Sequence, residues 1–261
     1  MSETTYFLRH DARTFVPTEH VSGAWNAEEQ HIAPALGLLA HAVERDAVKR
    51  GRELRLGRIS CDIFGVVPME AVTVVVEVVR PGRTIELVEA RLEHAGRRIV
   101  VARAWLVQQL ETGGIAGTPV TPLPEPAGMP AWDPTTVWPG GFIASAELRR
   151  REIEPGRAQF WVRPRVDLLR DERVSATARM IGVLDIANGM TVRQDPREVL
   201  FPNLDLTVHL VRDPVGEWIG FDTSVTFSGD GRGLTSSIVH DVDGVVGQST
   251  QVLTVRPHRT G

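Results

Sequence analysis

A carboxylate inside an apolar helical segment is the first feature of this sequence that could do chemistry. Residues 175–190 read SATARMIGVLDIANGM, and their apolar residues recur at the spacing of a buried helical face, at Met180, Val183, Leu184 and Ala187. Asp185 follows Leu184 directly. A buried carboxylate needs partners or a raised pKa, so we expect Asp185 to act as a proton acceptor beside a water-filled site. The alternative is that it faces solvent or braces the helix end at Asn188-Gly189.

The composition excludes several classes of function. The 261 residues are 42% hydrophobic and 24% charged with a formal charge of −4, as in an ordinary globular protein of one large or two small domains. Acidic residues outnumber basic ones and no basic run carries aromatics, so we expect no nucleic-acid partner. No apolar run is long enough for a membrane span and no leader pattern opens the chain, which favours a cytoplasmic location.

The cysteine and histidine pattern predicts neither a metal site nor another cofactor. Cys61 is the only cysteine, so no internal disulfide or thiolate cluster can form. The eight histidines show no metal-binding spacing. A Gly-x-Ser-x-Gly motif is absent and Cys61 has no obvious partner, so the sequence does not support a covalent acyl-enzyme.

Helical and strand patterns follow one another twice along the chain. Residues 31–48 predict a helix, and β-branched residues alternating through 58–110 predict four antiparallel strands. The proline-rich segment that follows predicts a stiff linker that Trp132 and Trp138 hold on the surface. Strand patterns at 141–163, a helix within 171–190 and strands in 203–256 then repeat the order. We therefore expect two units, 1–112 and 139–261, joined by a linker at 113–138.

The two copies differ where one of them carries polar side chains. Aligning the helices sets Asp185 opposite Ala40, and aligning the last strands sets Gln251 opposite Leu106. Both differences replace an apolar side chain by one that can handle a proton or hold a water. The sequence therefore predicts one working site per chain, in the C-terminal unit.

Three stretches of the second half carry a resemblance to a known family. They are Asp185-Ile-Ala-Asn-Gly189, Asn203-Leu-Asp-Leu-Thr-Val-His-Leu210 and Gly216-Glu-Trp218. With these motifs the chain resembles the thioesterase II type of acyl-CoA thioesterase, over nearly its whole length and most strongly from residue 180 to 255. The resemblance implies an α+β double hotdog fold, in which two tandem units each wrap a curved antiparallel sheet around a central helix. It also implies an enzyme that hydrolyses acyl-CoA or a related acyl thioester.

The resemblance further implies a water-activating triad of an Asp, a Thr and a Gln. Asp185 and Gln251 match the first and third positions, whereas Asn203 stands where the family pattern has Thr, two residues before Asp205. Asp185 would be the general base, and the amides of Asn203 and Gln251 would orient the water. Backbone N–H groups at a helix terminus or a strand edge would receive the oxyanion. The alternative is that the three side chains only satisfy one another in a polar plug.

Other residues have weaker expected roles near the site. Asp205 and Thr207 share the strand face of Asn203 by period two, which would let them support it from behind. His209 is more often a packed or edge histidine than a catalytic one. The acyl chain would lie in an apolar tunnel beside the central helices, lined by Met180, Leu184 and Leu39.

Two other functions remain open on the sequence. The Asn in place of Thr also fits a non-catalytic protein of the same fold that binds acyl groups or other hydrophobic ligands. A hotdog hydratase would need an Asp/His pair, and no histidine lies close after Asp185. Because hotdog units commonly pair their sheets, we expect the chain to form a homodimer. The sequence leaves the acyl-chain length and the native thioester open.

Overall fold

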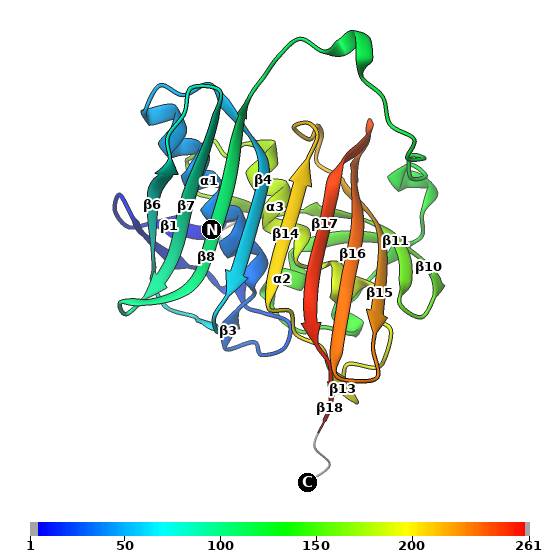
Figure 1. Cartoon of the computed structure of the whole chain (residues 1–261). Coiled ribbons are helices and arrows are strands. Elements are labelled where there is room, and N and C mark those ends of the chain that lie inside the picture. Colours follow the sequence, from blue (N-terminus) through cyan, green and yellow to red (C-terminus); the bar gives the residue numbers. More distant parts are fainter. Residues whose placement is uncertain (1–4, 259–261) are drawn as a thin grey trace.

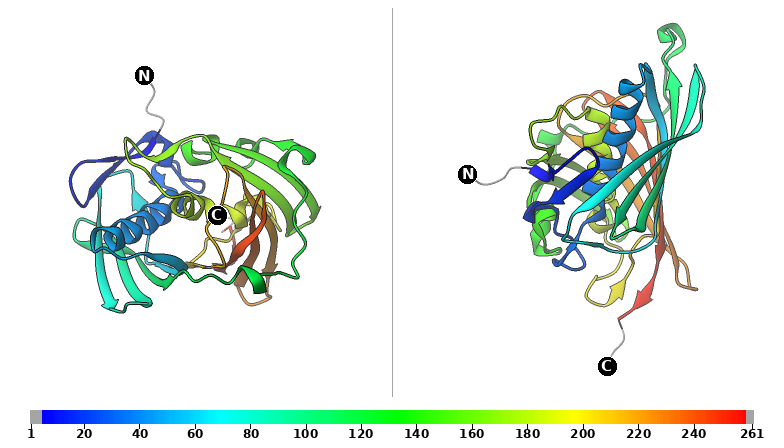
Figure 2. Two further views of the ribbon diagram at one scale, coloured as in Figure 1. Left: turned by 90° about the horizontal axis from the view of Figure 1, so that it is seen from above. Right: turned by 90° about the vertical axis from the view of Figure 1, so that its left-hand side faces the viewer.

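One large curved sheet encloses two helices. The computed structural model describes residues 5–258, and within them a 14-stranded sheet wraps around helices α1 (Ile32–Lys49) and α3 (Ala176–Leu184), as Figures 1 and 2 show. Neighbouring strands of this sheet pair antiparallel, except for β1 and β12, which pair parallel. The strands of this large sheet that precede residue 110 are β1 (Thr5–Arg9), β2 (Thr14–Pro17), β4 (Leu54–Ile63), β6 (Val72–Arg80), β7 (Ile85–His94) and β8 (Arg97–Gln108).

The second half of the chain supplies the rest of the sheet. Its strands are β9 (Ala131–Trp132), β10 (Ala146–Glu154), β11 (Arg157–Pro164), β12 (Asp167–Leu169), β14 (Asp205–Leu210), β15 (Ile219–Phe227), β16 (Arg232–Asp241) and β17 (Gly244–Thr254). Two small two-stranded sheets add β3 (Glu29–Gln30) with β5 (Val67–Pro68), and β13 (Val199–Leu200) with β18 (Arg256–Pro257). The short helix α2 (Gly141–Ala144) comes just before β10, and the short helix α4 (Ala187–Met190) follows α3.

The strand order repeats itself about the centre of the sheet. From the central pair of β4 and β14, the order runs outward as β4-β8-β7-β6-β2 on one side and as β14-β17-β16-β15-β11 on the other. In each half the helix precedes the four strands nearest the centre. The internal repeat that the sequence predicted is therefore present in the topology.

The two helices cross in the middle of the core, where each presents a glycine. A β-carbon on Gly37 would lie 2.7 Å from the Gly182 Cα, so the backbones touch there. The helices run antiparallel, since Ser175 at the start of α3 bonds to Glu44 in the second half of α1. The start of α1 consequently lies beside the end of α3.

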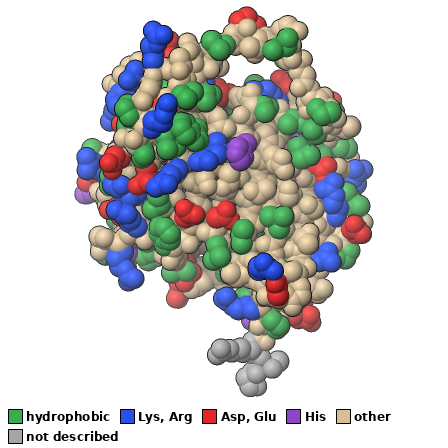
Figure 3. All heavy atoms as spheres, viewed as in Figure 1, with side chains coloured by type: hydrophobic (Ala, Val, Ile, Leu, Met, Phe, Trp, Pro, Cys, Tyr) green, Lys and Arg blue, Asp and Glu red, His purple; other side chains and the backbone are tan. Residues whose placement is uncertain are grey.

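The outer face of the sheet carries both charged and apolar side chains. Figure 3 shows charged side chains gathered on the left of this face, over the first half of the chain, where ion pairs on β7 and β8 join Glu89 to Arg91 and Arg103. The inner faces of the strands pack on α1 and α3. The helix predicted at 31–48 is α1, and the four strands predicted within 58–110 are β4, β6, β7 and β8, of which β4 begins earlier, at Leu54.

Three predicted elements need correction. The helix of 175–190 is interrupted after Leu184, and α4 begins only at Ala187. The strand pattern expected from residue 141 onward starts only at Ala146, because residues 141–144 form α2. The C-terminal end of the expected surface linker belongs to the folded core. There β9 pairs with β10, and Trp138 is only 3% exposed. The extended, proline-rich part before β9 arches over one end of the molecule (Figure 1).

No helix of the described residues is long and apolar enough to cross a membrane.

Candidate functional site

Asp185 sits at the point where the second central helix breaks. Helix α3 begins at Ser175, whose Oγ accepts the Ala178 N–H at 2.9 Å, a standard N-cap. It ends at Asp185, whose backbone has left the regular hydrogen-bonding pattern, so the side chain projects from the helix end and not from its flank. The carboxylate is 5% exposed.

Asn203 and Gln251 both donate to one oxygen of that carboxylate. The Asn203 Nδ2 lies 2.6 Å and the Gln251 Nε2 lies 2.7 Å from Asp185 Oδ1. Within residues 5–258 no hydrogen bond reaches the second oxygen, Oδ2. The three residues singled out by the repeat and by the family pattern are thus in direct contact. The amide N–H groups hold the carboxylate in place and leave one oxygen for another partner.

Burial makes Asp185 a much weaker acid than an ordinary aspartate. Desolvation raises its pKa from 3.8 to about 7, while the hydrogen bonds from Asn203 and Gln251 lower it in part and the charge of Asp205 raises it. A group with a pKa near 7 is suited to take and return a proton at neutral pH. The predicted raised pKa is therefore supported by the geometry of this site.

The expected placement of Asp205 and Thr207 is wrong in one respect. Asn203 bridges Leu253, whereas Thr207 pairs with Thr250, so β14 and β17 differ in register by one residue between the two positions. Such an irregularity turns later side chains to the opposite face. Thr207 accordingly lies on the outer face, where its hydroxyl meets the Ser60 hydroxyl at 2.7 Å.

Asp205 nevertheless supports the site through two hydrogen bonds. Its backbone oxygen accepts the Asn203 Nδ2 at 3.0 Å, so both hydrogens of that amide are used. Its side chain accepts the backbone N–H of Val252 at 2.7 Å, next to Gln251. Asp205 thereby fixes the positions of both amides without facing Asp185. His209, on the same strand, is exposed.

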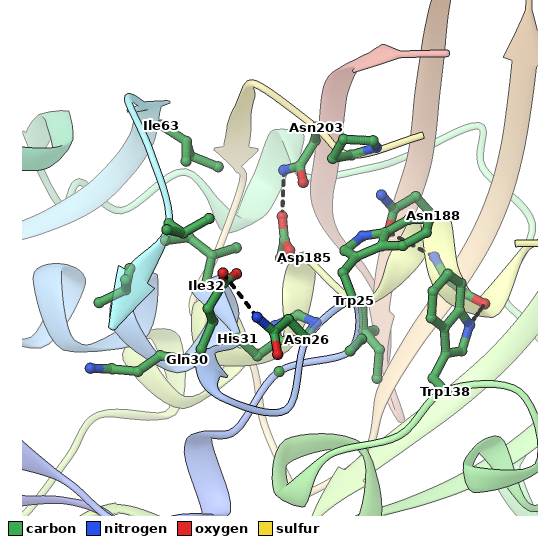
Figure 4. Close-up of a pocket in the computed structure, with 18 of the residues that line it drawn as sticks. Trp25, Asn26, Gln30, His31, Ile32, Ile63, Trp138, Asp185, Asn188 and Asn203 are labelled. Atoms are coloured by element: carbon green, nitrogen blue, oxygen red, sulfur yellow. Dashed lines mark hydrogen bonds between the residues drawn. The ribbon is translucent and has the colours of Figure 1, made fainter. Parts of the chain in front are cut away.

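Asp185 lies at the wall of a cavity. The cavity has a volume of about 150 Å³, and Asp185 and Asn203 line it from the second half of the chain. Gln251 does not line it and contacts Asp185 from behind. The opposite wall comes from residues before α1 and at its start, as Figure 4 shows. The walls also include Trp25, Asn26, His31, Ile32, Ile63, Trp138, Ile143, Asn188 and Met190.

An aromatic cluster closes one side of this cavity. Trp25 meets both Trp138 and Phe201 edge to face, with ring centroids 4.8 Å and 5.1 Å away. Trp138 is fixed by donating its indole N–H to the Gly189 carbonyl at 2.8 Å. Sequence spacing did not predict this wall, because its members lie in irregular segments far apart in the chain.

The three residues expected to line an acyl tunnel do not reach this cavity. Met180, Leu184 and Leu39 are fully buried in the core. Met180 lines a different cavity, together with Tyr6 and Arg179. The apolar surface available next to Asp185 is instead supplied by Ile32, Ile63 and Trp138.

Neither metal nor thiol chemistry is evident around Asp185. Among the described residues no group of three or more His, Cys, Asp or Glu side chains could hold a metal ion. Cys61 is fully buried, and its burial raises the pKa of the thiol.

Known proteins share this fold. A conserved protein with a hotdog fold from Alicyclobacillus acidocaldarius is 14% identical, has a TM-score of 0.75, and the alignment covers 97% of each chain. A putative thioesterase II from Thermobifida fusca is 17% identical with a TM-score of 0.71, over 97% of this chain and 96% of the other. An acyl-CoA thioesterase II from Mycobacterium marinum is 16% identical with a TM-score of 0.68, over 98% and 97%. The chain has the hotdog fold.

Sequence profiles identify the family. The acyl-CoA thioesterase N-terminal domain matches residues 21–107, and the acyl-CoA thioesterase C-terminal domain matches residues 120–255. The chain therefore belongs to the acyl-CoA thioesterase family, as its motifs predicted. No curated protein sequence matches it.

Proposed function

We propose that the protein hydrolyses acyl-CoA or a related acyl thioester by direct attack of water, with Asp185 as the general base. The observation that carries this proposal is the Asp185 carboxylate itself. It is buried at a helix break, two amides hold one of its oxygens, and it lines a cavity. Its pKa of about 7 suits a group that exchanges protons at neutral pH.

The proposed reaction needs no other protein group to be covalently changed. Asp185 Oδ2 takes a proton from water as the water oxygen bonds to the thioester carbonyl carbon, and the carbonyl electron pair moves onto oxygen. When the tetrahedral intermediate collapses, the carbon–sulfur bond breaks and the leaving thiolate receives the proton from Asp185. The products are a carboxylic acid and a free thiol.

Asn203 and Gln251 take different parts in this scheme. Gln251 lies behind Asp185 and holds the carboxylate in position. Asn203 also donates to Asp185, but it lines the cavity, so its Oδ1 is available to accept the second hydrogen of the attacking water. The Thr-to-Asn difference from the family pattern is thus compatible with catalysis, because Asn, like Thr, offers both a donor for the carboxylate and an acceptor for the water.

The experiment follows release of free thiol from a panel of acyl-CoAs by the wild type and by Asp185→Asn. The amide keeps the size of the side chain and an oxygen for Asn203 and Gln251 but cannot accept a proton from water. We expect turnover by the wild type and a loss of at least about a hundredfold in kcat in the variant, with substrate still bound.

Other outcomes would assign another function. Retention of acyl-CoA without thiol release by the wild type would favour the ligand-binding protein. A change in enoyl absorbance without thiol release would favour a hydratase. Equal turnover by wild type and Asp185→Asn would remove Asp185 from the mechanism.

We also propose the organisation of the whole molecule. Two tandem hotdog units, 1–112 and 139–261, would be joined by 113–138, with the catalytic carboxylate only in the second. The palindromic strand order supports two units, and the single set of Asp185 and Gln251 against Ala40 and Leu106 supports one site. We propose a cytoplasmic homodimer, for which light scattering of the purified chain gives the mass.

A further inference from the structure

We propose that His31 donates its Nε2–H to the thioester carbonyl oxygen and stabilises the oxyanion that forms there. The inference rests on the proposed hydrolysis and supplies the donor that this scheme lacks. Neither the repeat nor the family motifs single out His31.

His31 lies across the cavity from Asp185. It is the N-cap of α1, and the start of α1 packs beside the end of α3 because the two helices are antiparallel. Both His31 and Asp185 line the cavity, and Figure 4 shows them around the same space, each from the end of its own helix. The ring packs on Phe142 with centroids 4.2 Å apart, which fixes its orientation.

The hydrogen bonds of His31 fix which nitrogen carries the proton. Its Nδ1 accepts the backbone N–H of Ala33 at 3.1 Å. In a neutral imidazole one nitrogen accepts and the other donates, so the proton is on Nε2. Within residues 5–258 no other group bonds to Nε2. Nε2–H is therefore the donor that the ring has left for a ligand in the cavity that His31 lines.

The surroundings keep the ring neutral at the pH of catalysis. Burial lowers the pKa of His31 to about 3, and no charged group acts on it appreciably. The other titratable side chains that line the cavity are Asp185 and Glu29. A ring that stays neutral cannot transfer its proton to the developing thiolate or to Asp185. It acts as a fixed hydrogen-bond donor, whose strength grows as charge develops on the carbonyl oxygen.

Several donors near the start of α1 are occupied or missing, which leaves the Ile32 N–H and the His31 ring at this end of the cavity. The first N–H groups of a helix are the usual candidates for binding an oxyanion. Here the Ala33 N–H is bonded to the His31 ring, and residue 34 is a proline without an N–H. The side chain of Gln30 donates to the backbone oxygens of Pro68 and Glu70. The imidazole thus accepts the Ala33 N–H through Nδ1 and presents its own Nε2–H in place of that donor.

The same position in the other helix carries an ordinary cap. Ser175 caps α3, and serine is among the residues preferred there, whereas histidine is not. Asp185 and His31 therefore lie at one junction, where the end of α3 meets the start of α1, whereas Ala40, which aligns with Asp185, lies inside α1. Both unusual residues occur at the end where the cavity lies.

The test uses two capping variants that differ in the donor. His31→Ser copies the cap of α3 and removes the N–H from the cavity, whereas His31→Asn caps equally well and keeps an amide N–H. We expect His31→Ser to lower kcat about 10²–10³-fold with little change in KM, as for loss of one oxyanion donor. His31→Asn should recover part of that loss. The pH midpoint of turnover should stay that of the wild type in both, because Asp185 is untouched.

Several results would overturn the assignment. They are a kcat within about threefold of the wild type in His31→Ser, a loss that appears only in KM, and no difference between the Ser and Asn variants. Thermal unfolding of both variants checks that they fold. If His31→Ser does not fold, the kcat of His31→Asn is compared with that of the wild type. A wild type that releases no thiol contradicts the proposed hydrolysis itself. A turnover that needs Asp185 but not His31 contradicts only this inference.

Discussion

Gly37 and Gly182 face each other where helices α1 and α3 cross, but the space around them is unequal. A β-carbon on Gly37 would come within 2.7 Å of the Gly182 Cα and 2.9 Å of the Ala178 carbonyl oxygen. A β-carbon on Gly182 would meet its nearest neighbour, the Gly37 Cα, at 3.6 Å, an ordinary contact. The crossing brings the end of α3, with Asp185, to the start of α1.

This asymmetry predicts opposite effects of the same substitution. Gly37→Ala must push the helices apart and should destabilise the fold by about 1–3 kcal/mol, the usual cost of overpacking. Gly182→Ala fits and should be neutral or stabilising by up to about 1 kcal/mol, because alanine favours the helix. Denaturant unfolding measures both, and equal destabilisation by the two variants would contradict the close approach.

The main elements of this fold follow from local pattern. Alternating β-branched residues fix β6, β7 and β8, and apolar spacing fixes α1. Asp185 and Gln251 were found because each departs from an apolar residue in the other copy, at Ala40 and Leu106. Periodicity thus located the repeat, and comparison of its two copies located the polar exception.

The errors came from features that sequence spacing does not record. A one-residue irregularity before Asp205 turned Thr207 to the outer face, and no turn residue marks it. Trp138 and His31 line the cavity because segments distant in the chain pack together there. Leu39 belongs to the packed core and not to a tunnel wall. Periodicity distinguishes buried from exposed positions, but it does not distinguish packed core from cavity wall.

Turnover should require the ionised form of Asp185 and so fall toward acid pH. With a pKa of about 7, the ionised fraction declines about tenfold per pH unit below that value. We expect kcat/KM to follow it, with a midpoint near pH 7. His31, with a pKa of about 3, adds no second limb in this range. Rates of thiol release between pH 5 and 9 measure the profile, and a midpoint near pH 4 would contradict a desolvated base.

The same raised pKa predicts a pH-dependent stability difference. The folded protein holds the Asp185 proton more tightly than the unfolded chain does, so ionisation destabilises the fold as pH rises from about 4 to about 7. Asp185→Asn removes that effect. It should match the wild type below about pH 4 and be more stable above pH 7, by up to several kcal/mol. Unfolding free energies at pH 4, 6 and 8 measure this difference.

A surface carboxylate provides the control for that measurement. Asp62 lies on β4 and is exposed. Asp62→Asn should change stability little at any pH, because an exposed carboxylate keeps its hydration in both states. If Asp185→Asn shows the same flat profile as Asp62→Asn, the carboxylate at the helix break is not desolvated.

Cys61 should not react with thiol reagents in the native protein. It is fully buried, and burial raises the pKa of its thiol, so the reactive thiolate is scarce. A disulfide reagent that reports free thiol should therefore detect the thiol product of turnover without a contribution from the protein. One thiol per chain should appear only after unfolding in guanidinium. Rapid reaction of the folded protein would show that the core around Cys61 opens readily.

The two amides that contact Asp185 should set the pH at which it works. Their hydrogen bonds lower its pKa, opposing burial, so removing either should move the midpoint of kcat/KM upward and reduce turnover at pH 7. Gln251→Leu installs the residue type of Leu106 in the other copy and tests this directly. Gln248→Leu makes the same chemical change on the exposed face of β17 and should leave the profile unaltered.

Asn203 allows the same test from inside the cavity. Asn203→Ala removes both the donor to Asp185 and the acceptor for water, so it should raise the midpoint and lower kcat more than Gln251→Leu does. Asn203→Thr restores the residue of the family pattern and keeps one hydroxyl for either role, so most of the activity should remain. A midpoint that stays in place or falls in Asn203→Ala and Gln251→Leu would show that these amides do not stabilise the ionised base.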